Sequence, residues 1–209
     1  MNYTELVQNI QNWTENDDTE FTANIDTIIK MAEKRIYRDV DLPVTRKIST
    51  SLVTVAGTDT VDMPSDFVLS RWVAVTYDNE KHLLSKKDVS YIRDFWPDTS
   101  LRGRLRYYAD LDNNTLIFAP RPDAVYSLEV SYMYYPTTIV TASTTWLGDN
   151  AEMTLLYACL LESSLFHKYD SDTVKKWSEV YKNGIDQLTR EHMGTRRRTD
   201  ETRGGENRG

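Results

Sequence analysis

Histidine side chains are common general bases and metal ligands, and this chain has only three of them. His82, His167 and His192 stand far apart, and none has the spacing of a metal-binding motif. His167 and His192 lie near the predicted ends of two helices, where an imidazole interacts with the helix dipole. We therefore interpret all three histidines as structural.

The one cysteine, Cys159, lies inside the apolar run TLLYACLLE, and an intrachain disulfide is impossible. A small core residue is the simplest interpretation of this position. A nucleophilic thiol is the alternative, but no recognisable motif places a histidine or asparagine beside it. The sequence thus offers no cysteine-based active site.

Carboxylates are plentiful, and two acidic stretches could suggest a hard cation. The stretch DSD at 170–172 falls between two predicted helices, where Asp and Ser are capping residues. The stretch DLDNN at 110–114 lacks the glycine and the later glutamate of an EF-hand loop, so a turn is the better account. A carboxylate pair for glycoside hydrolysis stays open, because some pair among 32 acidic residues will always be close.

No nucleotide-binding, metalloprotease or serine-hydrolase motif is present. We therefore expect no enzyme activity, no cofactor and no metal site. The N-terminus has no secretory pattern, and no stretch approaches about 18 apolar residues. We expect no membrane partner and assembly in a cytoplasm.

Charge is distributed unevenly along the chain, whose net charge is −7. The last sixteen residues, GTRRRTDETRGGENRG, carry a net positive charge, so the rest is strongly acidic. Their five arginines are Arg196, Arg197, Arg198, Arg203 and Arg208. A basic arm on an acidic body suits docking onto an acidic partner surface. Alone, such a tail cannot offset the cost of about 1–2 kcal/mol per residue for ordering its backbone. The alternative is a nucleic-acid-binding arm, whose affinity would fall steeply with salt.

Two helices are predicted in the N-terminal part. Apolar residues at helical spacing over 3–13 predict the first, and Asn2 with Glu5 fits a capping box. The second is predicted over about 24–39, with Asn24 as its N-cap. Pro43 follows and disfavours helix at the residue before it.

Two more helices are predicted near the C-terminus. Asp149 is the expected N-cap of a helix that is apolar on nearly all sides over 153–161, which predicts a central place in a bundle. The last helix is predicted over about 172–193, and Gly194 is expected to end it. The stripes of these helices predict a shared core of Ile25, Ile28, Ile29, Ile36, Leu155, Leu156, Cys159, Val174, Trp177, Tyr181, Ile185 and Leu188.

Strands are predicted over about 45–140, where the apolar period falls towards two. Hairpins are expected around Gly57, around Asp78-Asn79 and at 112–114. A short helix over 85–95 is expected to interrupt the strands, with Ser85 and Asp88 as its capping pair. One face of the last strand is expected to carry Leu128, Val130, Tyr132 and Tyr134.

Tyrosine and tryptophan are abundant, with 13 Tyr and five Trp. They indicate either a protein–protein interface or a tyrosine-rich core between two sheets. Stacking on single-stranded nucleic acid is a weaker alternative, for which the nearby LRGRLRYY supplies arginines.

The expected fold is α+β: a helical bundle formed by the N- and C-terminal helices, with an inserted antiparallel β-domain and an extended C-terminal arm. We divide the chain into N-terminal bundle helices over 1–42, the β-domain over 43–145, C-terminal bundle helices over 146–193 and the arginine-rich arm over 194–209.

Three stretches carry a resemblance to a known family. They are YTELVQNIQNWTENDDTEFTANIDTIIKMAEKRIYRDVDLPVTRK, FVLSRWVAVTYDN and TTWLGDNAEMTLLYACLLESSLF. In their residues and in their order along the chain, these stretches resemble the head-to-tail adaptor, or head-completion, proteins of short-tailed bacteriophages. The resemblance covers the chain from Tyr3 to about Arg198, and its middle part is the least specific.

The resemblance implies a virion protein at the head–tail interface. Such adaptors form a ring of their own copies, usually twelve, beneath the portal protein. They join the portal to the tail nozzle, tail-tube or fibre proteins and help to retain the packaged double-stranded DNA. By this likeness the five tail arginines would bind the portal. The alternatives are another head-completion or tail subunit and, less readily, a tail-associated cell-wall hydrolase.

Overall fold

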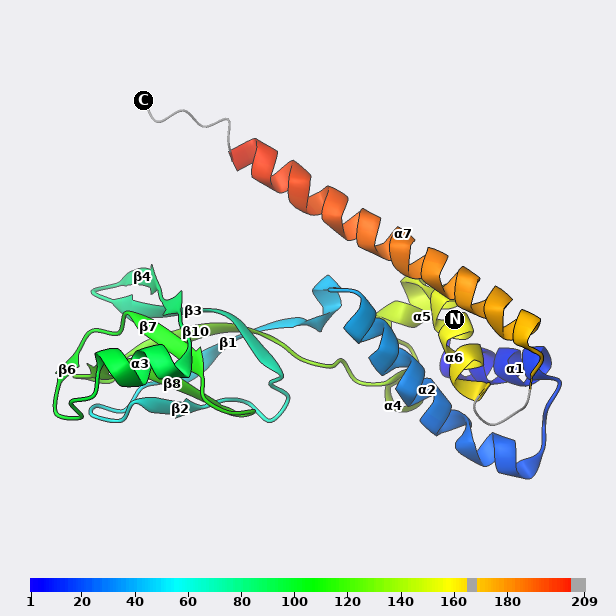
Figure 1. The fold of residues 1–209 in the computed structure, drawn as a ribbon, viewed down its shortest axis with the longest axis horizontal. Coiled ribbons are helices and arrows are strands. Elements are labelled where there is room, and N and C mark those ends of the chain that lie inside the picture. Colours follow the sequence, from blue (N-terminus) through cyan, green and yellow to red (C-terminus); the bar gives the residue numbers. More distant parts are fainter. Residues whose placement is uncertain (165–168, 204–209) are drawn as a thin grey trace. The chain divides into compact units, whose positions relative to one another are not determined.

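The chain folds into a helical unit and a β unit. The computed structural model describes residues 1–164 and 169–203, with side chains through Glu191. The helical unit comprises Met1–Val44 and Pro136–Gly209, and the β unit comprises Thr45–Tyr135 (Figure 1). This arrangement confirms an α+β fold in which helices from both ends of the chain flank a β-domain. The chain returns to the helical unit at Pro136, earlier than the sequence indicates, because α4 packs on α2.

The helical unit is arranged around α6, against which α1, α2, α5 and α7 pack. Its centre is apolar on all sides, as predicted: every residue from Thr154 to Leu160 is buried. The helices of this unit are α1 (Tyr3–Thr14), α2 (Thr19–Asp39), α4 (Ile139–Ala142), α5 (Trp146–Asn150), α6 (Glu152–Ser163) and α7 (Ser171–Arg203), and a 3-10 turn (Pro43–Thr45) follows α2.

The core of the helical unit draws on α2, α6 and α7. Of the residues that the sequence assigns to it, Val174 and Ile185 are half-buried on α7. The structure buries the others, which are Ile25, Ile28, Ile29, Ile36, Leu155, Leu156, Cys159, Trp177, Tyr181 and Leu188.

Local capping explains where the helices begin. The capping box at the start of α1 is confirmed: Asn2 accepts from the Glu5 amide at 3.0 Å, and the Glu5 carboxylate accepts from the Asn2 amide at 2.9 Å. The predicted start of α2 at Asn24 is wrong, because the helix already begins at Thr19. Asn24 lies inside it and donates its side-chain amide to the carbonyl of Glu20 at 2.8 Å.

The predicted N-cap at Asp149 is also wrong, because a short helix precedes α6. Asp149 lies inside α5, which Thr145 caps by accepting from the Gly148 amide at 3.4 Å. The backbone then breaks at Ala151, and α6 begins after it.

The last helix runs past Gly194, where the sequence predicts its end, and continues to Arg203. A single glycine inside a helix costs only about 1 kcal/mol relative to alanine. The residues that follow Gly194 include three consecutive arginines and no proline, so they favour continued helix.

The β unit contains two four-stranded sheets. The first has the order β1-β10-β3-β4, and the second has the order β2-β8-β7-β5. A third sheet has two strands, β6 and β9, which pair in parallel. The strands are β1 (Arg46–Val53), β2 (Thr60–Asp62), β3 (Leu69–Tyr77), β4 (Glu80–Leu83), β5 (Ser85–Lys86), β6 (Arg102–Gly103), β7 (Tyr107–Asp110), β8 (Thr115–Ala119), β9 (Arg121–Pro122) and β10 (Ser127–Met133).

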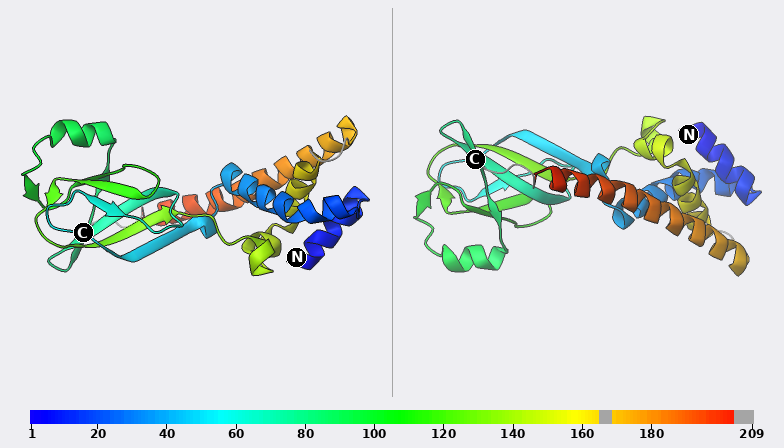
Figure 2. Two further views of the ribbon diagram at one scale, coloured as in Figure 1. Left: turned by 90° about the horizontal axis from the view of Figure 1, so that it is seen from below. Right: turned by 90° about the horizontal axis from the view of Figure 1, so that it is seen from above.

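The two sheets form a sandwich with a shared core. Leu128, Val130 and Tyr132 of β10 face inward together, as their alternation predicts, and pack with Leu116 and Phe118 of β8. On the outer face of the second sheet lies α3 (Val89–Phe95), whose Ile92 packs with buried residues of β7 and β8. Both views in Figure 2 show α3 to one side of the strands. The helix thus covers one sheet and exposes its own far side.

Two of the three predicted hairpins are confirmed. Strands β3 and β4 pair antiparallel across Asp78 and Asn79, which both have positive φ. This is the backbone conformation that two-residue hairpin turns need and that Asp and Asn tolerate. Strands β7 and β8 pair across the turn at 112–114.

The predicted hairpin around Gly57 is wrong. Strand β1 pairs with β10, whereas β2 pairs with β8 in the other sheet. Gly57, at φ +82°, donates its amide to the carbonyl of Pro122 at 2.7 Å, so the connection crosses between sheets instead of closing a hairpin. Alternation gives each strand its buried face but does not identify its partner.

The predicted helix over 85–95 begins later, at Val89, and Asp88 alone caps it by accepting from the Ser90 amide at 2.9 Å. Ser85 instead belongs to β5, which pairs parallel with β7. The antiparallel prediction therefore holds for most strands, but β5–β7 and β6–β9 are parallel.

Candidate protein-binding surfaces

Of the candidate residues for chemistry, the structure describes the side chains of Cys159 in the helical unit and His82 in the β unit. Cys159 is fully buried in α6, and burial raises the pKa of its thiol well above the ordinary value. A neutral buried thiol is a poor nucleophile. His82 lies on the exposed strand β4, where its Nε2 is 4.0 Å from the Glu80 carboxylate. The side chains of His167 and His192 lie outside the described residues.

Both acidic stretches that could suggest a cation serve local structure. Asp170 accepts the amides of Asp172 and Thr173 at 3.0 and 2.8 Å, which is the predicted capping role. Asp112 accepts the amide of Asn114 at 2.8 Å in the β7–β8 turn, also as predicted. In the part of the chain that the structure describes, no three metal-binding side chains gather into a potential site. Over the same residues, no helix has the length and apolar character to cross a bilayer.

The arginines that the sequence assigns to portal binding lie at the end of α7 and beyond it. Arg196, Arg197, Arg198 and Arg203 fall within the helix, but their side chains lie outside the described ones. Arg208 lies outside the described residues altogether. Their role in binding therefore stays a prediction.

In the β unit, several aromatic side chains gather on and beside α3. Tyr91 and Phe95 are one helical turn apart and their rings stack at 4.4 Å between centroids. Trp96 lies 5.1 Å from the ring of Tyr107 on β7. Above them, the Lys87 ammonium lies 5.0 Å from the centroid of Tyr91 and 5.8 Å from that of Tyr107. These residues form a continuous aromatic surface with a cation at its edge.

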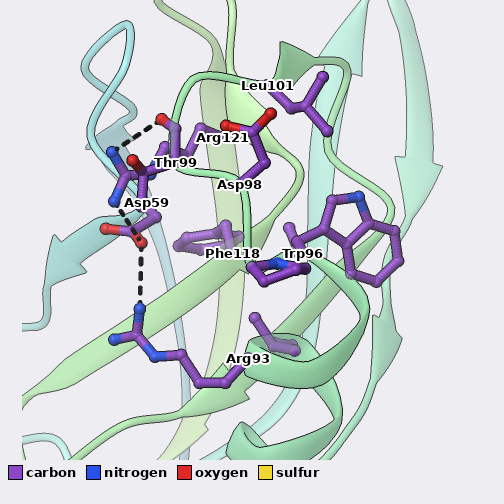
Figure 3. Close-up of a pocket in the computed structure, with 11 residues that line it drawn as sticks. Asp59, Arg93, Trp96, Asp98, Thr99, Leu101, Phe118 and Arg121 are labelled. Carbon is purple, nitrogen blue, oxygen red and sulfur yellow. Dashed lines mark hydrogen bonds and ion pairs between the residues drawn. The ribbon is translucent and has the colours of Figure 1, made fainter.

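A pocket of ≈ 290 Å³ adjoins this aromatic surface (Figure 3). Trp96 and Leu101 line one part of it, and Phe118 of β8 lies at its base. The loop after α3 shapes the pocket: Asp98 accepts from the amide and hydroxyl of Ser100 at 2.8 and 2.7 Å. We call the pocket and the aromatic residues together the α3 surface: Lys87, Tyr91, Arg93, Phe95, Trp96, Leu101, Tyr107 and Arg121.

Two guanidinium groups share a single carboxylate beside the pocket. Arg121 Nη2 and Arg93 Nη1 lie 3.3 and 3.6 Å from the same oxygen of Asp59 (Figure 3). Arg121 also donates to the carbonyl of Thr99 at 3.1 Å, which fixes its position. Arg93 contacts the same carboxylate at the longer distance, and its side chain is half-exposed. A guanidinium has five N–H donors, so this pair keeps capacity for a further acceptor.

The helical unit carries a different surface at the turn between α1 and α2. Trp13 is 47% exposed and packs edge-on against Tyr157 of α6 at 5.6 Å. The turn is well defined: the Thr14 hydroxyl donates to the Ile10 carbonyl at 2.8 Å, and Glu15 adopts the left-handed C-cap conformation. Exposed carboxylates follow Trp13 closely. We call this surface the Trp13 corner: Trp13, Glu15, Asp17, Asp18 and Glu20.

The core interpretation of the abundant tyrosines is confirmed for three residues, and the interface interpretation stays a prediction. Tyr77, Tyr108 and Tyr132 are buried in the sandwich core. Tyr91 and Tyr107 instead belong to the α3 surface. This surface is not among the features expected from the sequence, although YIRDFWP carries a signal for it: Tyr91 stands one helical turn before Phe95, and Trp96 follows Phe95 directly.

Comparison with known protein families gives one match that spans nearly the whole chain. Residues 1–205 match the family described as SU10 adaptor protein. A comparison with curated proteins finds no match. An adaptor of this kind is a structural component of a phage particle and contacts other head and tail proteins. Because the match includes both units and the whole of α7, the chain belongs to the SU10 adaptor family and is a bacteriophage adaptor.

Proposed function

We propose that this adaptor forms a closed ring of its own copies between the portal and the tail nozzle of a short-tailed phage. In this proposal the arginine-rich C-terminal segment binds the portal, and the ring helps to retain the packaged DNA. The observation that carries the proposal is the adaptor family match over residues 1–205.

The form of α7 supports a docking role for the C-terminus. The helix has 33 residues, and its last buried described side chain is that of Leu188. From there to Arg203 the sequence contains no leucine, isoleucine, valine or aromatic residue other than His192. This part of α7 therefore offers little for an apolar core and much for charge-assisted hydrogen bonds to carboxylates of a partner.

The division of charge between the units supports a role beside DNA. The helical unit contains 20 of the 32 acidic residues but 14 of the 25 basic ones, whereas the β unit is nearly balanced. Carboxylates that line a channel repel phosphates, so DNA can slide past without sticking. An acidic helical unit fits a channel wall better than it fits a DNA-binding face.

The decisive experiment measures the mass of the purified adaptor by native mass spectrometry, alone and with its portal ring. We expect a complex with several adaptor copies on each portal ring. We expect a chain truncated after Met193 to stay folded by circular dichroism but to leave the portal unoccupied. A shorter truncation after Arg203 is the control and should keep most binding, because it retains four of the five arginines. An adaptor that never associates with the portal would refute the proposal.

A further inference from the structure

We infer that the α3 surface of one copy binds the Trp13 corner of a neighbouring copy. The inference rests on the proposed ring, because it names the two surfaces by which copies would meet. A ring needs a heterologous contact, in which one patch of a subunit meets a different patch of the next. Each copy carries both patches, on separate units.

The α3 surface has the composition of a binding hot spot. Its Phe95 is 65% exposed and its Leu101 is 55% exposed, and both flank the pocket residue Trp96. Aromatic residues and arginine are the types most often found at the centre of protein interfaces. Helix α3 packs on the second sheet through Ile92, and Trp96 and Tyr107 pack partly against the same cluster, so Phe95 is the most exposed aromatic residue of this surface. A cluster of this kind points to an apolar partner.

The cations of the α3 surface indicate which charge the partner carries. Lys87 and Arg93 are exposed, and Arg93 shares the Asp59 carboxylate with Arg121. The neighbouring carboxylates Asp88 and Asp98 accept from the amides and hydroxyls of Ser90 and Ser100, which holds them in place and leaves them charged. Asp94 on the same helix is exposed as well, so the surface attracts a partner's carboxylates locally, at Lys87 and Arg93, and not through a net positive charge.

The Trp13 corner has this complementary chemistry. Its tryptophan stands on the last turn of α1, and the exposed carboxylates of Glu15, Asp17, Asp18 and Glu20 follow it. The ion pairs among the described residues do not include any of these four carboxylates. An exposed tryptophan can fill a concave site with little loss of conformational freedom. In the contact, Trp13 lies in the pocket beside Trp96 and Leu101, while the carboxylates meet Lys87 and Arg93.

Charge reversal tests this pairing. One variant carries Lys87→Glu with Arg93→Glu, and the other carries Asp17→Lys with Asp18→Lys; all four side chains are exposed, so each variant should fold. We expect each variant alone to weaken association between copies by about tenfold or more, measured on the portal ring by native mass spectrometry. A chain with all four changes should regain ring assembly.

Cysteine cross-linking tests proximity directly. The native Cys159 is buried and does not compete, so Trp13→Cys with Leu101→Cys introduces the only accessible thiols among the described residues. We expect oxidation of the assembled protein to give a ladder of linked copies on a denaturing gel. The control pairs Trp13→Cys with Val125→Cys, and it should give no ladder, because Val125 is at least as exposed as Leu101 but lies in the β unit outside the α3 surface.

The outcomes separate this inference from the proposed function. If the unaltered protein forms rings on the portal, but charge reversal has no effect and no ladder forms, the ring proposal stands and the contact is wrong. A cross-link within one chain also overturns the contact between copies. If the unaltered protein forms no ring, both the inference and the ring proposal fail.

Discussion

The carboxylate of Glu33 accepts a hydrogen bond from the amide of Ile139 at 3.0 Å, although 106 residues separate the two in the sequence. Glu33 is only 3% exposed, and its carboxylate also receives the hydroxyl of Thr138, the N-cap of α4. This bond joins α2 to the first helix after the β unit. The two separate parts of the helical unit are therefore held together by a buried polar contact as well as by apolar packing.

Removing this acceptor should destabilise the protein. We expect Glu33→Ala to lower the free energy of unfolding by about 1–3 kcal/mol, because it leaves the buried amide of Ile139 unsatisfied. Glu33→Gln keeps an acceptor at the same place and should cost less. Urea unfolding followed by circular dichroism measures both. Equal stability for the alanine variant and the unaltered protein would refute this role.

Glu33 should also give stability a pH dependence. Burial raises the pKa of its carboxyl above the ordinary 4.5, so the folded state holds the proton more tightly than the unfolded state. As the pH rises past 4.5, the unfolded chain loses this proton first, and the free energy of unfolding falls until the folded carboxyl has ionised too. We expect Glu33→Gln to gain stability relative to the unaltered protein between pH 4 and pH 7. A constant difference over this range would contradict the raised pKa.

Close packing of α7 on α6 depends on Gly184. A Cβ atom at this position would overlap the hydroxyl oxygen of Thr154 on α6. We expect Gly184→Ala to destabilise the helical unit by about 1–3 kcal/mol from overpacking, partly offset by about 1 kcal/mol of helix propensity. In the double variant with Thr154→Ala, much of this loss should be recovered. Urea unfolding of all four proteins gives the coupling energy, and strict additivity would show that the two sites do not touch.

Trp177 should be a major source of stability within α7. It is buried and packs edge-on against Tyr169 at 5.0 Å. Trp177→Ala should cost about 3–5 kcal/mol through the cavity that it leaves. Val180→Ala on the exposed side of the same helix is the control and should change stability by less than about 0.5 kcal/mol. A small loss for Trp177→Ala would mean that the helix does not depend on this contact.

Sequence patterns predicted features that short-range chemistry determines. The capping box of Asn2 and Glu5 and the turn at Asp78-Asn79 both depend on neighbours within three residues. The inward face of β10 followed from strict alternation. These features need no knowledge of the rest of the fold, so the sequence alone was sufficient.

Several predictions were wrong where pairing with residues distant in the sequence overrides a local sequence signal. The segment around Gly57 looks like a hairpin, but its strands join β10 and β8, which come much later in the chain. Ser85 has a capping side chain, yet its amide pairs with Arg106 across strands. The α3 surface was not predicted, for the same reason. Its pocket needs Arg93 and Arg121 beside Asp59, and only the folded sandwich brings these residues together.

The arginine trio at 196–198 should decide portal attachment. We expect replacement of Arg196, Arg197 and Arg198 by alanine to leave the thermal unfolding of the protein nearly unchanged and to abolish stable binding to the portal ring. Lost charge-assisted hydrogen bonds to partner carboxylates are the physical reason. The matched control replaces Lys175, Lys176 and Lys182, three exposed cations on the same helix, by alanine and so removes equal charge. If both triple variants weaken binding equally at every salt concentration, α7 is attracted to the portal only through its net charge, and the arginine trio has no specific role. If the arginine variant alone loses the portal, the end of α7 is the docking segment.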